Sequence, residues 1–142
     1  TPYGIPDPAT VPCALAIAFG ASWVGRGFSG DVKGTTDLMT RAIRHHGFAF
    51  LNILSPCVTW RGEEQHKELR AKTRAVPGDH DVTDREAALR FTNEEEHLTT
   101  GVLYDVARPT LLDELAAIEL HARGDAVPPT RGEFLRAFRP VA

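Results

Sequence analysis

The sequence predicts an α/β fold in which a parallel sheet is flanked by helices. Segments with helical and strand patterning alternate along residues 11–54, and the second strand segment is apolar at nearly every position. A strand that is apolar on both faces is typical of a parallel sheet covered by helices on each side. The order helix, strand, helix, strand therefore predicts a βαβ unit.

The alternation begins with a short helix and a strand. "VPCALAIAFG", residues 11–20, is almost wholly apolar, with Pro12 suited to a first helical position and Gly20 to the residue after the end. "SWVGRGF", residues 22–28, has the apolar spacing of a strand, and the glycine-rich segment that follows it predicts a turn. We expect this helix to be buried on several sides.

A second helix and a second strand follow. Four apolar residues at helical spacing predict a helix whose stripe faces the sheet: Leu38, Met39, Ala42 and Ile43. Gly47 is expected to end this helix. "FAFLNIL", residues 48–54, predicts a strand covered on both faces and stopped by Pro56.

The remainder of the chain is more polar. "EEQHKELRAKTR", residues 63–74, predicts either a solvated helix or an arm at an interface. "TGVLYDV", residues 100–106, is a further strand candidate. Helix starts are expected at three threonines, two of them with a Glu three residues later: Thr83 with Glu86, Thr110, and Thr130 with Glu133.

Composition argues against several classes of protein. The 142 residues carry 16 Lys and Arg against 19 Asp and Glu, without a basic stripe, so nucleic-acid binding is not expected. No apolar stretch reaches the roughly 18 residues of a membrane span, and residues 1–10 lack the pattern of a signal peptide. We expect no membrane contact and a cytoplasmic location. The Pro-rich connector at residues 1–12 indicates a fragment of a longer protein.

Cys57 is the first candidate for chemistry because it directly follows the predicted strand that ends at Pro56. Ligands of parallel α/β sheets gather at the carboxyl ends of strands. One interpretation is a structural cysteine, since a free thiol behaves as a small hydrophobic group. Another is a nucleophile, which requires a histidine base such as His45, His46 or His66 close in space.

Other candidate ligands have simpler explanations. His45 and His46 suit the carbonyl end of a helix dipole. His80, between Asp79 and Asp81, is either part of a divalent-cation site or part of a polar loop. The chain has no Walker loop, no G-x-G-x-x-G that follows a strand and no C-x-x-C, and two cysteines cannot form a four-thiolate site alone. These patterns assign no catalytic residue.

Longer stretches carry a resemblance to a known family. "ALAIAFGASWVGRGFSGDVKG" and "AIRHHGFAFLNILSPCVTW" resemble the second half of the thiamine-diphosphate-binding β subunit of 2-oxoacid:ferredoxin oxidoreductases. "DHDVTDREAAL" and "TGVLYDVARPT" resemble the C-terminal extension of that subunit. The resemblance implies a partial thiamine-diphosphate-binding domain over residues 1–60 and a mixed C-terminal extension at a subunit interface over residues 61–142.

The resemblance also implies what the complete subunit holds. The family's β subunit binds thiamine diphosphate, magnesium and a four-iron four-sulfur (4Fe-4S) cluster, and it cleaves the bond beside the 2-oxo group of a 2-oxoacid. The acyl group passes to coenzyme A, electrons pass to ferredoxin, and an α subunit is the protein partner. By resemblance, Cys57 in "SPCVT" is one thiolate ligand of the cluster, and the other three lie outside this chain.

The chain lacks the Gly-Asp-Gly segment that holds magnesium and diphosphate in the family. We therefore expect none of these cofactors to bind this chain alone, and we expect the isolated oxidoreductase fragment to be inactive. Two alternatives are a noncatalytic interaction module, which binds a partner through apolar helices, and a small cysteine-dependent enzyme that uses Cys57.

Overall fold

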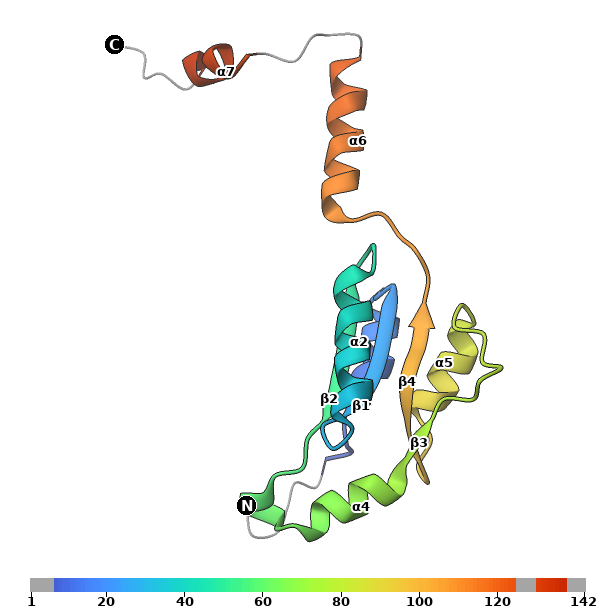
Figure 1. The fold of residues 1–142 in the computed structure, drawn as a ribbon. Coiled ribbons are helices and arrows are strands. Elements are labelled where there is room, and N and C mark those ends of the chain that lie inside the picture. Colours follow the sequence, from blue (N-terminus) through green and yellow to red (C-terminus); the bar gives the residue numbers. More distant parts are fainter. Residues whose placement is uncertain (1–6, 125–129, 138–142) are drawn as a thin grey trace. The chain divides into compact units, whose positions relative to one another are not determined.

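The structure is a computed structural model that describes residues 7–124 and 130–137. Contacts divide the chain into two compact units, Thr1–Arg108 and Pro109–Ala142. The first unit holds the sheet (Figure 1), with the elements α1 (Pro12–Ala18), β1 (Trp23–Phe28), α2 (Val32–Arg44), β2 (Ala49–Leu54), α3 (Val58–Arg61), α4 (Glu64–Lys72), β3 (Thr73–Ala75), α5 (Arg85–Thr92) and β4 (Leu98–Asp105). The second unit holds α6 (Leu111–Arg123) and α7 (Arg131–Ala137).

The sheet has the strand order β2-β1-β4-β3. β1 and β2 are parallel, as expected for a βαβ unit, whereas β4 is antiparallel to β1 and parallel to β3. The predicted α/β fold with helices flanking a sheet is confirmed. The boundary predicted between residues 60 and 61 stays a prediction, although β4, from the proposed extension, pairs directly with β1.

Helices cover both faces of the sheet because β1 is apolar on both faces. On one face, Val24 and Leu103 pack with Ile17 of α1 and Ala88 of α5. On the opposite face, Trp23 and Val102 pack against α2 in a cluster with Leu38. Each cluster is apolar and buried, so the sheet forms the middle layer of the first unit.

Two segments are less buried than their sequences suggested. β2 is half-buried along its length, since β1 is its only neighbour among the described strands. In α2, Leu38 is buried, but Met39 and Ile43 are 45% and 84% exposed. Met39 and Ile43 each follow a residue of the buried side, Leu38 or Ala42, and so project about 100° away from it around the helix. Of the four residues of the predicted stripe, only Leu38 and Ala42 therefore pack in the cluster against the sheet.

Side-chain caps begin α2, α5, α6 and α7, with Asp31 in front of α2. Thr110 and Asp113 form a reciprocal capping box at α6, and Thr130 pairs with Glu133 before α7, as the spacing predicts. The prediction for Thr83 is wrong, because Asp84 accepts the N–H groups of residues 86 and 87 and starts α5 itself. Asp84 lies one residue nearer the helix than Thr83. Its carboxylate accepts the hydrogen bonds of the first helical N–H groups, so the Thr83 hydroxyl does not cap the helix.

Helix α6 of the second unit carries many exposed apolar residues. All thirteen residues of α6 are exposed, including five large aliphatic ones: Leu111, Leu112, Leu115, Ile118 and Leu120. Within the described ranges, α6 and the other helices all fall short of the length and apolar character that crossing a bilayer requires.

Candidate functional site

Cys57 lies just beyond the end of β2, at the edge of the sheet where the parallel strands β1 and β2 both finish. We call this the carboxyl edge. The Ser29 N–H donates to the Leu54 carbonyl at 2.9 Å, so the two strand ends remain joined there. Cys57 is exposed and forms no disulfide. Its thiol is therefore available at the edge where α/β sheets hold ligands.

The backbone of Cys57 is held although its thiol is free. Its carbonyl accepts the N–H groups of Trp60 and Arg61 at 3.2 and 3.0 Å, in the first turn of α3. Its N–H donates to Oε1 of Gln65, in α4, at 3.0 Å. The sequence patterns gave no sign of the Gln65 contact.

Cys13, unlike Cys57, is buried. It is fully buried in the cluster beneath α1, with its Sγ 4.0 Å from the carbonyl oxygen of Gly25. Burial raises the pKa of the Cys13 thiol, and the nearby Arg26 and Asn52 offset this only in part. The neutral thiol is the form that a buried, weakly solvated site favours, so Cys13 is a structural residue.

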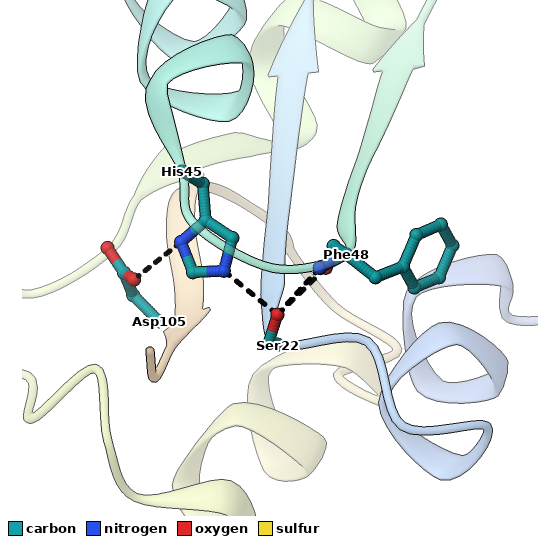
Figure 2. A network of polar contacts seen from close by, with 4 residues as sticks. All are labelled: Ser22, His45, Phe48 and Asp105. Carbon is teal, nitrogen blue, oxygen red and sulfur yellow. Dashed lines mark hydrogen bonds and ion pairs between the residues drawn. The ribbon is translucent and has the colours of Figure 1, made fainter. Parts of the chain in front are cut away.

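A polar network joins the other ends of the same strands (Figure 2). His45 follows α2, and its Nε2 lies 2.9 Å from Oγ of Ser22, while its Nδ1 lies 3.3 Å from Oδ1 of Asp105. Ser22 Oγ also accepts the Phe48 N–H at 2.9 Å. Gly47 has φ of 137°, and a Cβ there would collide with the Ser22 hydroxyl, so this glycine makes room for the network.

The contacts run from serine to histidine to aspartate, as in the catalytic triad of a hydrolase. However, the serine here is too buried to act as a nucleophile. Ser22 is only 1% exposed, and its oxygen is already bonded to the Phe48 N–H. A nucleophile must reach the substrate carbonyl. The network therefore ties the start of β1 to the start of β2 and the end of β4, and it does so at the edge opposite Cys57.

His80 lines a cavity that does not have Cys57 among its lining residues. A cavity of about 470 Å³ opens between α2, β3 and the loop before α5, with Asp37, Arg41 and His80 among its lining residues. His80 Nε2 is 2.9 Å from the Leu103 carbonyl oxygen, and its ring meets that of Phe91 edge to face. In residues 7–124 and 130–137, no three His, Cys, Asp or Glu side chains are grouped as a metal site would require.

Comparisons with known proteins agree on one family. Residues 57–119 match the family model for the C-terminal region of the pyruvate ferredoxin oxidoreductase beta subunit, and the match begins at Cys57. The 2-oxoacid:ferredoxin oxidoreductase subunit beta of a Sulfolobus species is 41% identical over 63 residues, 42% of this chain and 21% of the relative. The 2-oxoglutarate oxidoreductase subunit KorB of Mycobacterium tuberculosis is 37% identical over 57 residues, 40% of this chain and 15% of the relative.

A solved structure extends the similarity to nearly the whole chain. It is a 2-oxoglutarate:ferredoxin oxidoreductase from Magnetococcus marinus with 2-oxoglutarate, coenzyme A and succinyl-CoA bound. The match covers 99% of this chain and 48% of the solved one, with a TM-score of 0.83 and 31% identity.

All three comparisons thus show that this chain is similar to the β subunits of 2-oxoacid:ferredoxin oxidoreductases. The resemblance predicted from the sequence is thereby confirmed. The chain spans about a fifth of the Sulfolobus β subunit and about half of the solved Magnetococcus chain. The role of Cys57 as a cluster ligand stays a prediction.

The two thiols of this chain should differ sharply in reactivity. In the folded chain, a thiol reagent such as DTNB is expected to modify Cys57 rapidly and Cys13 only after unfolding, because Cys57 is exposed and Cys13 is buried with a raised pKa. Absorbance of the released thiolate measures both phases. Cys57→Ser should abolish the fast phase and Cys13→Ser should keep it; rapid modification of Cys13 in the folded chain would contradict the assigned burial.

The Ser22 network should matter for stability. Ser22→Ala leaves the Phe48 N–H without its side-chain acceptor in a part-buried site, so the free energy of unfolding should fall by about 1 kcal/mol. Urea unfolding of the chain measures this. Thr36→Ala, which removes a hydroxyl from the exposed side of α2, is the matched control and should cost less than about 0.5 kcal/mol. Equal losses in the two variants would show that the network contributes nothing specific.

Proposed function

We propose that this chain is the C-terminal part of the β subunit of a 2-oxoacid:ferredoxin oxidoreductase that works in the cytoplasm. In the complete enzyme, a 2-oxoacid and coenzyme A react to give an acyl-CoA, carbon dioxide and a proton, and an electron pair passes to ferredoxin. The bond beside the 2-oxo group breaks, and a carbon–sulfur bond to coenzyme A forms. The match of 99% of the chain to the Magnetococcus enzyme, at a TM-score of 0.83, carries this proposal.

Cys57 has the chemistry of one cluster ligand. Iron–sulfur clusters are held mainly by cysteine thiolates, and Cys57 offers an exposed thiol on a backbone that is hydrogen-bonded on both sides. Cys13 cannot share this role, because it is buried in the apolar cluster beneath α1. The remaining thiolates would come from polypeptide outside this chain. When bound, a 4Fe-4S cluster supplies a carrier of single electrons.

The thiamine diphosphate and magnesium implied by the family do not fit the described residues. Magnesium with a diphosphate requires fixed oxygen ligands. Asp31 follows the glycine-rich turn at the carboxyl edge, but its carboxylate accepts the Gly34 N–H at 3.0 Å and caps α2. The described residues are therefore assigned no catalytic step. The proposed role of the chain is to extend the sheet, present Cys57 and provide an interface to other subunits.

The C-terminal region, residues 61–142, is proposed to bind the α subunit. Leu111, Leu115 and Ile118 recur at helical spacing on one side of α6 and are 74%, 46% and 61% exposed. A stripe of large aliphatic side chains is normally buried against a partner. The charged helix α4, which the sequence suggested as an interface arm, has a mostly exposed surface, and this role also stays a proposal.

The two alternatives gain less support. A cysteine-dependent enzyme needs a base beside the thiol, whereas the side chain of α4 that bonds to Cys57 is the Gln65 amide, and the ring of the adjacent His66 lies against Phe28. A noncatalytic interaction module would also expose α6. It would have no use for a cluster ligand, so the two hypotheses differ in what Cys57 does.

Replacement of Cys57 tests the cluster assignment. In the complete β subunit, produced with its partner subunit, Cys57→Ala should abolish most of the cluster signal, because one of the thiolate ligands is lost. Iron and sulfide content and the electron paramagnetic resonance of the reduced protein measure the cluster. Cys13→Ala should retain it. Full cluster content in the Cys57→Ala protein would remove the ligand role and favour an interaction module.

Replacement of the α6 stripe tests the proposed interface with the α subunit. The double variant Leu115→Glu, Ile118→Glu should weaken association with the α subunit about 10-fold or more, because it places charges where aliphatic side chains are proposed to be buried. Leu120→Glu is the matched control, since Leu120 projects from the opposite side of α6. Sedimentation or calorimetry measures the dissociation constant. Identical binding by both proteins would exclude the stripe as the interface.

A further inference from the structure

The Cys57 thiol is exposed, yet the direction in which it projects is restricted. Both backbone polar groups of Cys57 are used: the carbonyl by Trp60 and Arg61 of α3, and the N–H by Gln65 of α4. With the backbone held at both groups, rotation about the Cα–Cβ bond is the main freedom left to the sulfur.

Gln65 can hold Cys57 only because α4 is itself attached to the sheet. The ring of His66, the next residue in α4, lies 5.3 Å from the ring of Phe28 at the end of β1. The guanidinium carbon of Arg70, one turn further along α4, lies 5.9 Å from the centre of the same ring. Arg70 Nη2 also donates to the Gly30 carbonyl at 3.0 Å.

These contacts form a closed path around the carboxyl edge. Cys57 follows β2, Gln65 connects it to α4, and His66 and Arg70 connect α4 to the end of β1. The end of β1 is joined back to β2 through the Ser29–Leu54 hydrogen bond. At Gly30 a Cβ would crowd the Phe28 ring and come within 2.8 Å of His66 Nε2, so a glycine permits α4 to approach this closely.

We propose that Gln65 is a positioning residue for Cys57, which rests on the proposed role of Cys57 as a cluster ligand. Gln65 fixes the backbone from which the thiolate projects. It also occupies the Cys57 N–H, which would otherwise be free to donate to a cluster sulfur. Groups that orient a metal ligand change metal retention, and hydrogen bonds to cluster sulfurs change the reduction potential.

The test uses three variants of the complete β subunit in its assembled enzyme. Gln65→Leu keeps the size of the side chain but removes the acceptor oxygen. Gln65→Glu keeps an acceptor oxygen in place. Ala71→Leu is the matched control, because it adds the same leucine at an exposed position of α4 without a change of charge. The measurements are the cluster midpoint potential, from a redox titration followed by electron paramagnetic resonance, and the rate of cluster loss to an iron chelator.

Gln65→Leu should lose its cluster about 10-fold faster than the wild-type protein. Its midpoint potential should rise, because the released N–H can donate to cluster sulfur and stabilise the reduced, more negative cluster. Gln65→Glu should restore retention of the cluster, and Ala71→Leu should match the wild type in both measurements. If Gln65→Leu and Ala71→Leu give the same potential and the same rate of loss, the positioning role is refuted.

The Cys57→Ala variant separates this result from a failure of the proposed function. If Cys57→Ala keeps a full cluster, Cys57 is not a ligand and the proposed function loses its basis together with the positioning role. If Cys57→Ala loses the cluster while Gln65→Leu behaves as Ala71→Leu, Cys57 remains a ligand and only the role of Gln65 is overturned.

Discussion

The parallel pairing of β1 with β2 is the interaction on which the rest of the structure depends. The register runs from Trp23 opposite Ala49 to Phe28 opposite Leu54, without a bulge. Because parallel strands end at the same edge, this register brings the glycine-rich turn after β1 next to the segment that carries Cys57. A shift by one residue would turn every side chain of β2 to the other face, but β2 is apolar at nearly every position, so its apolar pattern alone does not fix the register.

The two edges of this strand pair have different properties. At one edge, Ser22, His45 and Asp105 form a network in which the serine is buried and committed to a backbone N–H. At the other edge, the backbone of Cys57 is hydrogen-bonded, whereas its thiol is exposed and forms no disulfide. The first arrangement contains the residue types of a catalytic triad, and the second contains a single cysteine. Accessibility therefore separates a structural network from a candidate ligand better than residue type does.

The pairing of β4 with β1 connects the two regions that the resemblance separated. Val24 faces Tyr104, and Trp23 faces Asp105, so residues from the later half of the chain complete the core around β1. The apolar surfaces that stay exposed in the described residues lie on elements such as α2 and α6. Exposed apolar surfaces of this kind are typical of protein interaction sites.

Local sequence patterns predicted several elements and the family resemblance, although they did not predict α3 and they placed residues 73 and 74, which begin β3, in a helix. The alternation over residues 11–54 predicted α1, β1, α2 and β2, because these segments carry their own periodicity and end signals. The "SPCVT" segment marked Cys57, and its placement after β2 followed from the strand pattern. Capping was predictable where one acceptor was available, as at Thr110, and failed at Thr83, where the neighbouring Asp84 competed.

Which of these groups come into contact depends on the packing of the whole fold. Three features depend on how separate elements pack: the antiparallel pairing of β4 with β1, the exposure of Ile43, and the hydrogen bond from the Cys57 N–H to Gln65. No local sequence pattern encodes that packing. Ser22 and His45 are 23 residues apart, and their contact exists because α2 returns the chain to the start of β1. Periodicity reports which face of an element is apolar, whereas the neighbour on that face is selected by burial and hydrogen bonding across the whole fold.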